Sequence, residues 1–212
     1  MRTYLFKISI NKFNIIIMEK LIKLFCALFL ASTMFISCDK DDDDENEKNH
    51  FTSGGKEYTL TQGAFENYGL TDTADLKHDG YNLDLVLLSD GFTISTDSVG
   101  DMDITGTGQY IYFELFTSKG TEFDSREYTY SESIPYPIGT FDYSEFNLNY
   151  SEDIDDNEIE ITSGKVTISK DGDMYSISID CIDENNNAVT GFYKGTLKYY
   201  DYTVEEKSAS TK

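Results

Sequence analysis

Residues 165–181 read "KVTISKDGDMYSISIDC", and the polarity of this stretch alternates at almost every position. Apolar side chains occupy every second position on both sides of Asp171-Gly172, which is the period of a half-buried β-strand. Asp-Gly favours a tight hairpin because both residues tolerate positive φ. The stretch therefore predicts two antiparallel strands whose core-facing residues are Val166, Ile168, Tyr175, Ile177, Ile179 and Cys181.

The same pattern extends in both directions from this hairpin. The apolar phase set by Ile159 and Ile161 flips at Ser163-Gly164, which predicts a bulge or a corner there. Residues 183–188, "DENNNA", predict the next turn, and alternation resumes from Val189 onward. We therefore expect a three-strand antiparallel meander over residues 158–201.

The earlier part of the chain also alternates in short runs, and no run has a helical stripe of useful length. It predicts strands near 56–61, 81–88, 110–117, 126–131 and 138–150, with looser joins at 64–80 and 91–108. Many short strands without βαβ alternation indicate an all-β fold, either a meander that closes into a β-barrel or a two-sheet β-sandwich. Sequential hairpins favour the barrel, and the long early joins favour the sandwich. We expect one β domain over 51–204 and a frayed tail at 205–212.

Aromatic residues supply the best functional hint in this body. In residues 110–116, "YIYFELF", alternation places Tyr110, Tyr112 and Phe116 opposite the core-facing residues. Tyr128 and Tyr130 follow in a later strand. An exposed ledge of tyrosines can stack on sugar rings or hold a peptide. Packing beneath a covering layer is the alternative, because β-sheets are rich in Tyr. The ligand-binding candidates are Tyr110, Tyr112, Phe116, Tyr128 and Tyr130.

The N-terminus has the layout of a secretory signal peptide. Residues 18–38 read "MEKLIKLFCALFLASTMFISC", with a short basic segment, an apolar run too short for comfortable membrane spanning, and small residues before a cysteine. We predict a signal peptide over 1–37, with Met18 as the true start.

Residues 35–45, "FISCDKDDDDE", change abruptly from apolar to acidic. Ile36-Ser37-Cys38 resembles the lipobox of bacterial lipoproteins, although Phe35 stands where Leu is commonest. Lys40, Asp41 and Asp42 resemble the export signal of Bacteroidota surface lipoproteins. The resemblance implies acylation of Cys38 and an outer-membrane, cell-surface location, with residues 38–50 as an acidic tether that self-repulsion extends.

The body shows a second resemblance. The order "YTLTQG…DLVLLSDG…GTGQYIYFELF…SGKVTISKDG…VTGFYKGTLKYYD" over most of residues 55–201 resembles Bacteroidota lipoproteins described only as hypothetical or calycin-like. These motifs are patterns of strands and turns. The resemblance therefore implies a fold and a location but no activity.

Charge and missing chemistry narrow the function classes. The chain has a formal charge of −22, and the part from Cys38 onward, with 12 basic and 38 acidic residues, has −26. Such a field repels nucleic acid, so we expect no nucleic-acid partner. His78 lies in a polar loop without a nucleophile motif, and Cys181 lies on an apolar face, so neither indicates a catalytic role. Asp97, Asp101 and Asp103 suggest at most a loose calcium site, and no metal or cofactor is predicted.

These observations predict a non-catalytic binding module at the cell surface, anchored in the membrane through Cys38. Its expected ligand is a glycan, a peptide or a small apolar molecule. A structural or assembly lipoprotein with a protein partner is the first alternative, and a carbohydrate-active enzyme is the second. The carbohydrate-active enzyme would require two facing carboxylates in a cleft, one of them with a raised pKa.

Overall fold

The computed structural model describes residues 48–70, 78–98, 100–151 and 158–203. The predicted signal peptide and the predicted tail lie outside these residues, as do Cys38, Lys40, Asp41 and Asp42 and nearly all of the tether. In the part of the chain that is described, no helix is long and apolar enough to cross a bilayer.

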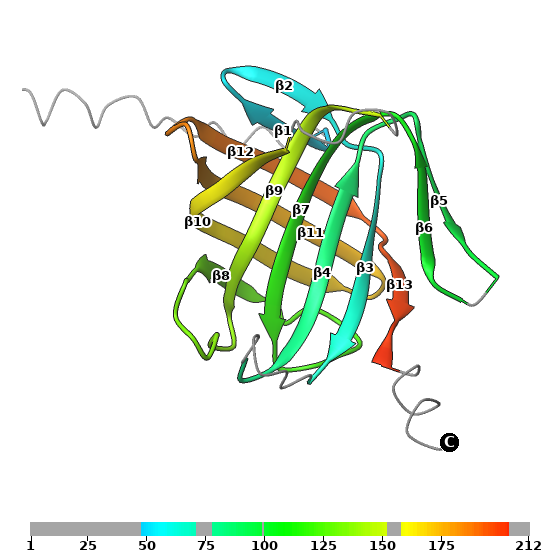
Figure 1. Cartoon of the computed structure of the whole chain (residues 1–212), viewed down its shortest axis with the longest axis vertical. Helices are drawn as coiled ribbons and strands as arrows, with labels where there is room; N and C mark the ends of the chain where they lie inside the picture. Colours follow the sequence, from blue (N-terminus) through cyan, green and yellow to red (C-terminus); the bar gives the residue numbers. More distant parts are fainter. Residues whose placement is uncertain (1–47, 71–77, 99, 152–157, 204–212) are drawn as a thin grey trace, which may run out of the picture. The chain divides into compact units, whose positions relative to one another are not determined.

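The described residues form an all-β fold, as the sequence predicts (Figure 1). Eleven strands form one sheet in the order β13-β3-β4-β7-β9-β8-β10-β11-β12-β1-β2, while β5 and β6 form a separate hairpin. The strands belong to one compact unit. Their bounds are β1 (His50–Ser53), β2 (Lys56–Thr59), β3 (Gln62–Gly69), β4 (Tyr81–Leu88), β5 (Phe92–Thr96), β6 (Met102–Gly106), β7 (Gly108–Thr117), β8 (Arg126–Tyr130), β9 (Thr140–Tyr150), β10 (Glu158–Asp171), β11 (Met174–Asp183), β12 (Ala188–Gly195) and β13 (Lys198–Asp201).

The large sheet curls into a half-barrel, so that β3, β4, β7 and β9 lie in front of β10, β11 and β12 (Figure 1). Buried side chains fill the space between the two halves. Phe51 of β1 meets Phe146 of β9 with ring centroids 5.9 Å apart, and Phe65 of β3 meets Tyr175 of β11 at 6.1 Å. The predicted inward faces of β4 and β7 are confirmed, because these side chains are fully buried: Leu83, Leu85, Leu87, Ile111, Phe113 and Leu115.

The central hairpin of the meander is confirmed, with β10 and β11 antiparallel and Asp171 opposite Met174. The turn residues are Gly172 and Asp173, one position later than expected, with φ +58° at Gly172. The predicted bulge is also present, since the register shifts between Ile161 and Ser163. Gly164 then takes φ +118°, and a Cβ there would lie 2.4 Å from Cα of Cys181.

The predicted end of the meander at residue 201 is wrong. The third strand, β12, ends at Gly195, and the chain then crosses to the other half of the sheet, where β13 pairs in parallel with β3. The Tyr193 hydroxyl donates to the Thr196 carbonyl across this corner, at 3.0 Å. Tyr199 keeps the predicted core-facing side, with its ring centroid 5.0 Å from that of Phe65, whereas Tyr200 is buried on the opposite face, in a cluster with Ala64 and Val86.

The two predicted loose joins are also wrong in part, because residues 62–69 form β3 and residues 92–96 and 102–106 form β5 and β6. The chain also enters the sheet earlier than predicted, at His50. The period-two signal is weak in β3 because Ala64 and Phe65, neighbours that face opposite sides, are both buried. Such a strand lacks the polar face that makes alternation visible.

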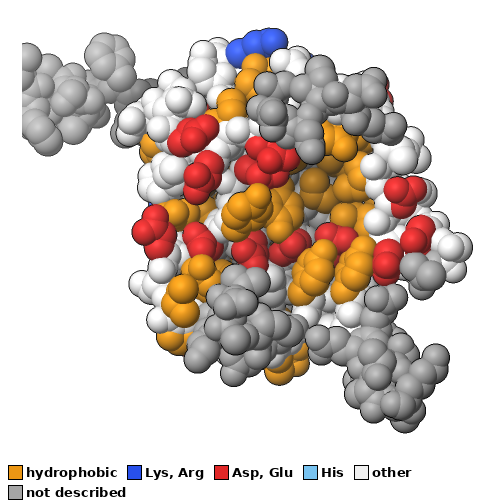
Figure 2. Space-filling model, in the orientation of Figure 1, with side chains coloured by type: hydrophobic (Ala, Val, Ile, Leu, Met, Phe, Trp, Pro, Cys, Tyr) orange, Lys and Arg blue, Asp and Glu red, His pale blue; other side chains and the backbone are white. Residues whose placement is uncertain are grey.

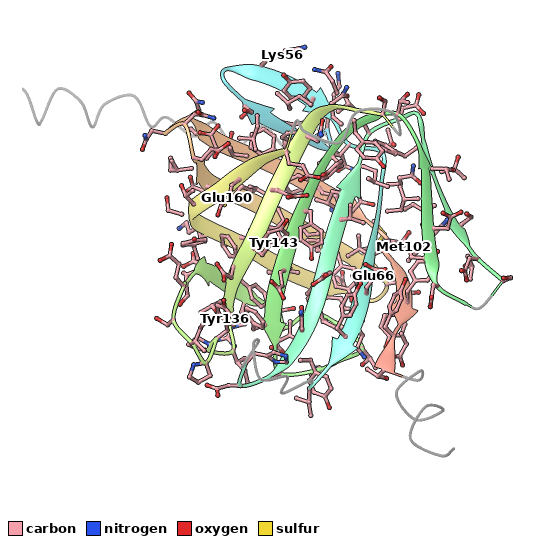
Figure 3. All side chains as sticks on the ribbon, viewed as in Figure 1. Lys56, Glu66, Met102, Tyr136, Tyr143 and Glu160 are labelled. Carbon is pink, nitrogen blue, oxygen red and sulfur yellow. The ribbon has the colours of Figure 1, made fainter. Side chains whose placement is uncertain are left out.

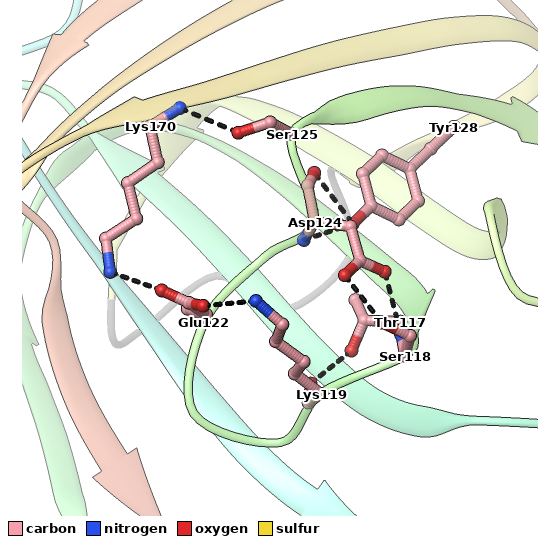
Figure 4. Close-up of polar contacts among 8 residues, drawn as sticks. All are labelled: Thr117, Ser118, Lys119, Glu122, Asp124, Ser125, Tyr128 and Lys170. Carbon is pink, nitrogen blue, oxygen red and sulfur yellow. Dashed lines mark hydrogen bonds and ion pairs between the residues drawn. The ribbon is translucent and has the colours of Figure 1, made fainter.

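The loop between β7 and β8 links the two halves at one end (Figure 4). Asp124 accepts from the Ser118 amide at 2.8 Å and from its hydroxyl at 2.6 Å, while Glu122 binds Lys119 and Lys170, each at 2.6 Å. Phe123 enters the core between these polar contacts, with its ring centroid 4.9 Å from that of Phe65.

Candidate binding pocket

A pocket lies on the outer face of the front half of the sheet, under the β5–β6 hairpin. Strand alternation fixes this face, because Leu83 and Leu85 point into the core and leave Asp84, Val86 and Leu88 pointing outward. The hairpin then covers the outward side chains and turns the sheet surface into a recess.

Hydrogen bonds tie the hairpin to the sheet. The Gln62 amide of β3 donates to the Phe92 carbonyl at 2.8 Å, and the Lys198 ammonium of β13 donates to the Ile94 carbonyl at 2.7 Å. Farther along, the Tyr200 hydroxyl donates to the Ser95 carbonyl at 3.2 Å. β13 therefore holds the hairpin over the sheet.

The pocket has a volume of about 290 Å³, slightly below the usual range for small-molecule sites. Figure 2 shows hydrophobic side chains gathered in a hollow on this face, with Asp and Glu side chains around them. In Figure 3, Tyr143 of β9 and Met102 of β6 lie on opposite sides of it, with Glu66 of β3 between. The lining residues are Glu66, Asp84, Val86, Leu88, Phe92, Met102, Ile104, Tyr110, Tyr112, Tyr143, Glu145 and Tyr150.

Tyrosine rings form much of the wall on the sheet side. Tyr110 meets Tyr150 edge to face, with centroids 5.8 Å apart and planes at 72°, and Tyr112 meets Tyr143 at 6.3 Å and 72°. Tyr143 is 61 % exposed and stands at the rim. Perpendicular neighbours of this kind can offer both ring faces and ring edges to a ligand.

Carboxylates form one row across the outer face of the sheet, and two of them, Glu66 and Asp84, line the pocket. The sheet register places Glu66 of β3 opposite Asp84 of β4, and Asp84 opposite Glu114 of β7. Like charges opposed in this way repel one another. The Asn82 side-chain amide stabilises one of these carboxylates, because it donates a hydrogen bond to Glu114 at 2.7 Å.

Within this row, Asp84 is the residue whose pKa is shifted most. One of its oxygens accepts a hydrogen bond from the Tyr112 hydroxyl, while the other, Oδ1, is buried without a partner. Burial raises the pKa of Asp84 to about 8, and the charges of Glu114 and Glu66 act in the same direction against the Tyr112 hydrogen bond. The carboxyl group therefore holds its proton near neutral pH.

A second tyrosine–carboxylate contact lies along the next edge of the pocket. The Tyr110 hydroxyl lies 2.9 Å from Glu145 and 3.1 Å from Glu158, and donates toward these carboxylates. Burial raises the pKa of Tyr110, and the two adjacent carboxylates raise it further, so the phenol stays protonated. Burial, with the charge of Glu158 acting in the same direction, also raises the pKa of Glu145.

The structure brings only two of the five predicted ligand-binding residues into the pocket, namely Tyr110 and Tyr112. Phe116 lies on the same face but is buried under Tyr136, whose ring stacks on it at 4.6 Å. Tyr128 is fully buried in the core between the sheet halves, and Tyr130 packs against that core. These three are therefore placed away from the pocket.

Sequence reasoning missed the acidic floor and the wall formed by the hairpin. The alternation of 81–88 places Asp84 on the outward face, which is the one available signal for it. Phe92, Met102 and Ile104 gave no such signal, because their segment read as a loop.

Three further residues that the sequence analysis considered, Cys181, His78 and Asp97, make contacts typical of structural residues. Cys181 is buried in the core, and burial raises its pKa to about 12. The His78 ring stacks on Phe116 at 5.4 Å. Asp97 caps the hairpin turn by accepting from the Gly100 and Asp101 amides, each at 2.9 Å. Within the described ranges, no group of three or more His, Cys, Asp or Glu residues could hold a metal ion.

No family model, no curated protein and no solved structure matches this chain. The geometry of the pocket is therefore the basis for any functional assignment.

Proposed function

We propose that the protein is a non-catalytic binding module that captures a small ligand in the pocket between the outer sheet face and the β5–β6 hairpin. The observation that supports this proposal is the recess of about 290 Å³ lined by tyrosine and aliphatic side chains. Concave, mostly apolar sites with a few placed polar groups are the usual form of small-molecule pockets.

The arrangement of the acids favours binding over glycoside hydrolysis. A glycosidase places two carboxyl groups on opposite sides of the bond that it cleaves. Here Glu66, Asp84 and Glu145 all come from the sheet, whereas the facing hairpin contributes Phe92, Met102 and Ile104. A raised pKa at Asp84 supplies one requirement of a general acid, but the facing partner carboxylate is lacking among the described lining residues.

A binding screen tests the pocket. The full-length protein, purified in detergent micelles, is offered glycans, fatty acids and small apolar molecules, and Tyr143→Ala is compared with wild type. Because Tyr143 is exposed at the rim, its truncation should weaken ligand binding about tenfold without unfolding the protein.

Met174→Ala is the matched control, since Met174 is also exposed but lies at the β10–β11 turn. A ligand that binds wild type and Tyr143→Ala equally well binds elsewhere. Failure of every probe to bind would contradict the proposed function.

The cell-surface location is part of the same proposal, and it rests on the sequence. A thioether-linked and acylated Cys38 would hold the domain at the outer membrane, with the acids after it as a spacer. Cys38→Ala should release the protein from membranes, as fractionation and immunoblotting would show. Full retention of Cys38→Ala in the membrane fraction would rule out this anchor.

A further inference from the structure

The charges around the pocket are all of one sign. Glu66, Asp84 and Glu145 line it, and none of the described lining residues is Lys, Arg or His. Ion pairs elsewhere in the described chain use Glu122 and Glu127 and leave the pocket acids uncompensated. The ammonium group of Lys198 donates a hydrogen bond to the Ile94 carbonyl, and neither residue lines the pocket.

The rest of the wall is apolar or aromatic. Phe92, Met102, Ile104, Val86 and Leu88 offer no charge, so they suit the hydrocarbon part of a ligand. The tyrosine rings have electron-rich faces that attract cations. Donation from the Tyr110 and Tyr112 hydroxyls to carboxylates further enriches these two rings.

We infer that the pocket binds an organic cation, a protonated amine carried on an apolar body. This inference rests on the proposed function and names the class of its ligand. The ammonium group lies toward Asp84 and Glu145, among the tyrosine rings, and the hydrocarbon part lies against the hairpin. A metal ion suits the same charge less well, because the described residues contain no cluster of ligands for one.

The unpartnered oxygen of Asp84 is the second observation that points to this ligand. An ionised carboxylate with a buried, unbonded oxygen is costly, so the empty pocket favours the protonated acid. The titratable groups that face Asp84 are Tyr112 and Glu114 from β7 and Glu66 and Tyr68 from β3, and none of them is a cation. A bound ammonium would supply the missing positive charge and expel the proton.

The charge of the whole chain acts in the same direction. A net charge of −22 attracts cations from solution and repels anions before either reaches the pocket. Fatty acids and sulfated glycans are therefore disfavoured relative to amines of equal size.

Three probes of one shape separate charge from shape: cyclohexylmethylamine, cyclohexylmethanol and cyclohexanecarboxylate. The affinities are measured by isothermal titration calorimetry of the full-length protein in detergent micelles, at about pH 7. The amine should bind at least about tenfold more tightly than the alcohol, because only the amine gains cation–π and ionic attraction. The carboxylate should bind most weakly. Equal affinities of amine and alcohol would overturn the inference while leaving the proposed function intact.

Two variants locate the amine. Asp84→Asn removes the carboxyl group that would ionise against the ammonium, with little change of shape, and Tyr143→Ala removes a rim ring, so each should weaken amine binding about tenfold. The control Asp180→Asn makes the same chemical change at an exposed position on β11 and should leave binding unchanged. An amine affinity that is unaffected by both pocket variants reports association with the acidic surface and contradicts the inference.

Proton release gives an independent readout. Titration in two buffers of different ionisation enthalpy should show that amine binding releases about one proton from wild type and clearly fewer from Asp84→Asn. Equal release from both proteins would exclude Asp84 as the group that meets the ammonium. If glycans or fatty acids bind in a Tyr143-dependent manner and the amine does not, only the cation inference fails. If no probe of any kind binds, both proposals fail.

Discussion

Leu83, Asp84 and Leu85 follow one another on β4, yet their surroundings have little in common. The two leucines are fully buried in the core, while the carboxyl group between them lies on the outer face beside Glu66 and Glu114. A strand can carry such opposite chemistry on consecutive residues because successive side chains point to opposite faces. The acidic floor of the pocket is therefore compatible with an apolar core one residue away.

Asp84 should make the stability of the protein depend on pH. Folded Asp84 keeps its proton up to a pKa of about 8, whereas in the unfolded chain it ionises near 3.8. Between these values the folded state binds more protons, so the free energy of unfolding falls as pH rises. Asp84→Asn removes this loss and should stabilise the protein by several kcal/mol, up to about 5, above pH 8 but not near pH 4.

Urea denaturation at the two ends of this pH range measures the effect. The exposed control Asp180→Asn should show no such pH-dependent gain. A constant difference between Asp84→Asn and wild type across the range would contradict the assigned environment of Asp84.

Gly164 is the second residue whose surroundings dictate its identity. With φ +118° and the Cys181 backbone 2.4 Å from the place of a Cβ, Gly164→Ala combines strain with a clash. We expect a loss of at least about 2 kcal/mol in the free energy of unfolding. Gly172→Ala, at φ +58° with open space around it, should lose only about 1 kcal/mol. Equal losses in thermal or urea denaturation would argue against the bulge.

The β5–β6 hairpin is the element that turns a sheet face into a pocket. It packs Phe92 and Ile94 against Ala64, Val86 and Leu88. Since it pairs only with itself in the described part of the chain, its position depends on this small apolar cluster and on a few hydrogen bonds. We therefore expect it to open more readily than the meander.

Ile94→Ala tests the local stability of this element. The substitution removes a buried side chain from the outer cluster, so amide hydrogen exchange in residues 92–106 should accelerate about tenfold or more. Exchange in β10, β11 and β12 should stay unchanged. Thr93→Ala, on the exposed face of the same strand, is the control. Uniform acceleration throughout the chain would mean that the hairpin does not open independently.

The hairpin also marks the limit of what the sequence could predict. Tyr110 and Tyr112 were identified because alternation within one strand sets the face of each side chain. The other wall depends on contacts between segments far apart, such as Gln62 with Phe92 and Lys198 with Ile94. Likewise Tyr128 reads as an outward tyrosine in isolation, and only the curl of the sheet places it in the core. Local periodicity carries no information on such pairings.

At the scale of the whole molecule, backbone hydrogen bonds join the two halves of the curled sheet on one side, where β9 pairs with β8 and β10, and core side chains join them across the open side of the described sheet. The end strands β2 and β13 have no further strand on their outer edges in the described chain. Phe123 contacts both halves, with centroids 4.9 Å from Phe65 and 6.0 Å from Tyr175. The barrel and sandwich alternatives are therefore both partly right, since one sheet curls far enough to face itself.

Phe123→Ala should weaken the contact between the halves. A cavity at a fully buried phenylalanine costs about 3–5 kcal/mol, and here the loss falls on both sides of the core. A large drop in the midpoint of cooperative thermal unfolding would be the expected result. Glu122→Gln, next to it in the same loop but with a partly exposed side chain, should cost less than about 1 kcal/mol. A smaller loss for Phe123→Ala than for Glu122→Gln would show that the loop does not link the halves.

The parallel pairing of β13 with β3 has a consequence for the order of assembly. Lys198 and Tyr200, which donate hydrogen bonds to the β5–β6 hairpin, belong to the last described strand, so a nascent chain contains every lining residue of the pocket before it contains these two residues. The contacts between β13 and the hairpin therefore form only after all the lining residues of the pocket have been synthesised. Proteolytic cleavage near residue 196 would therefore detach β13 from the chain that holds β10, β11 and β12 and leave these three strands uncut.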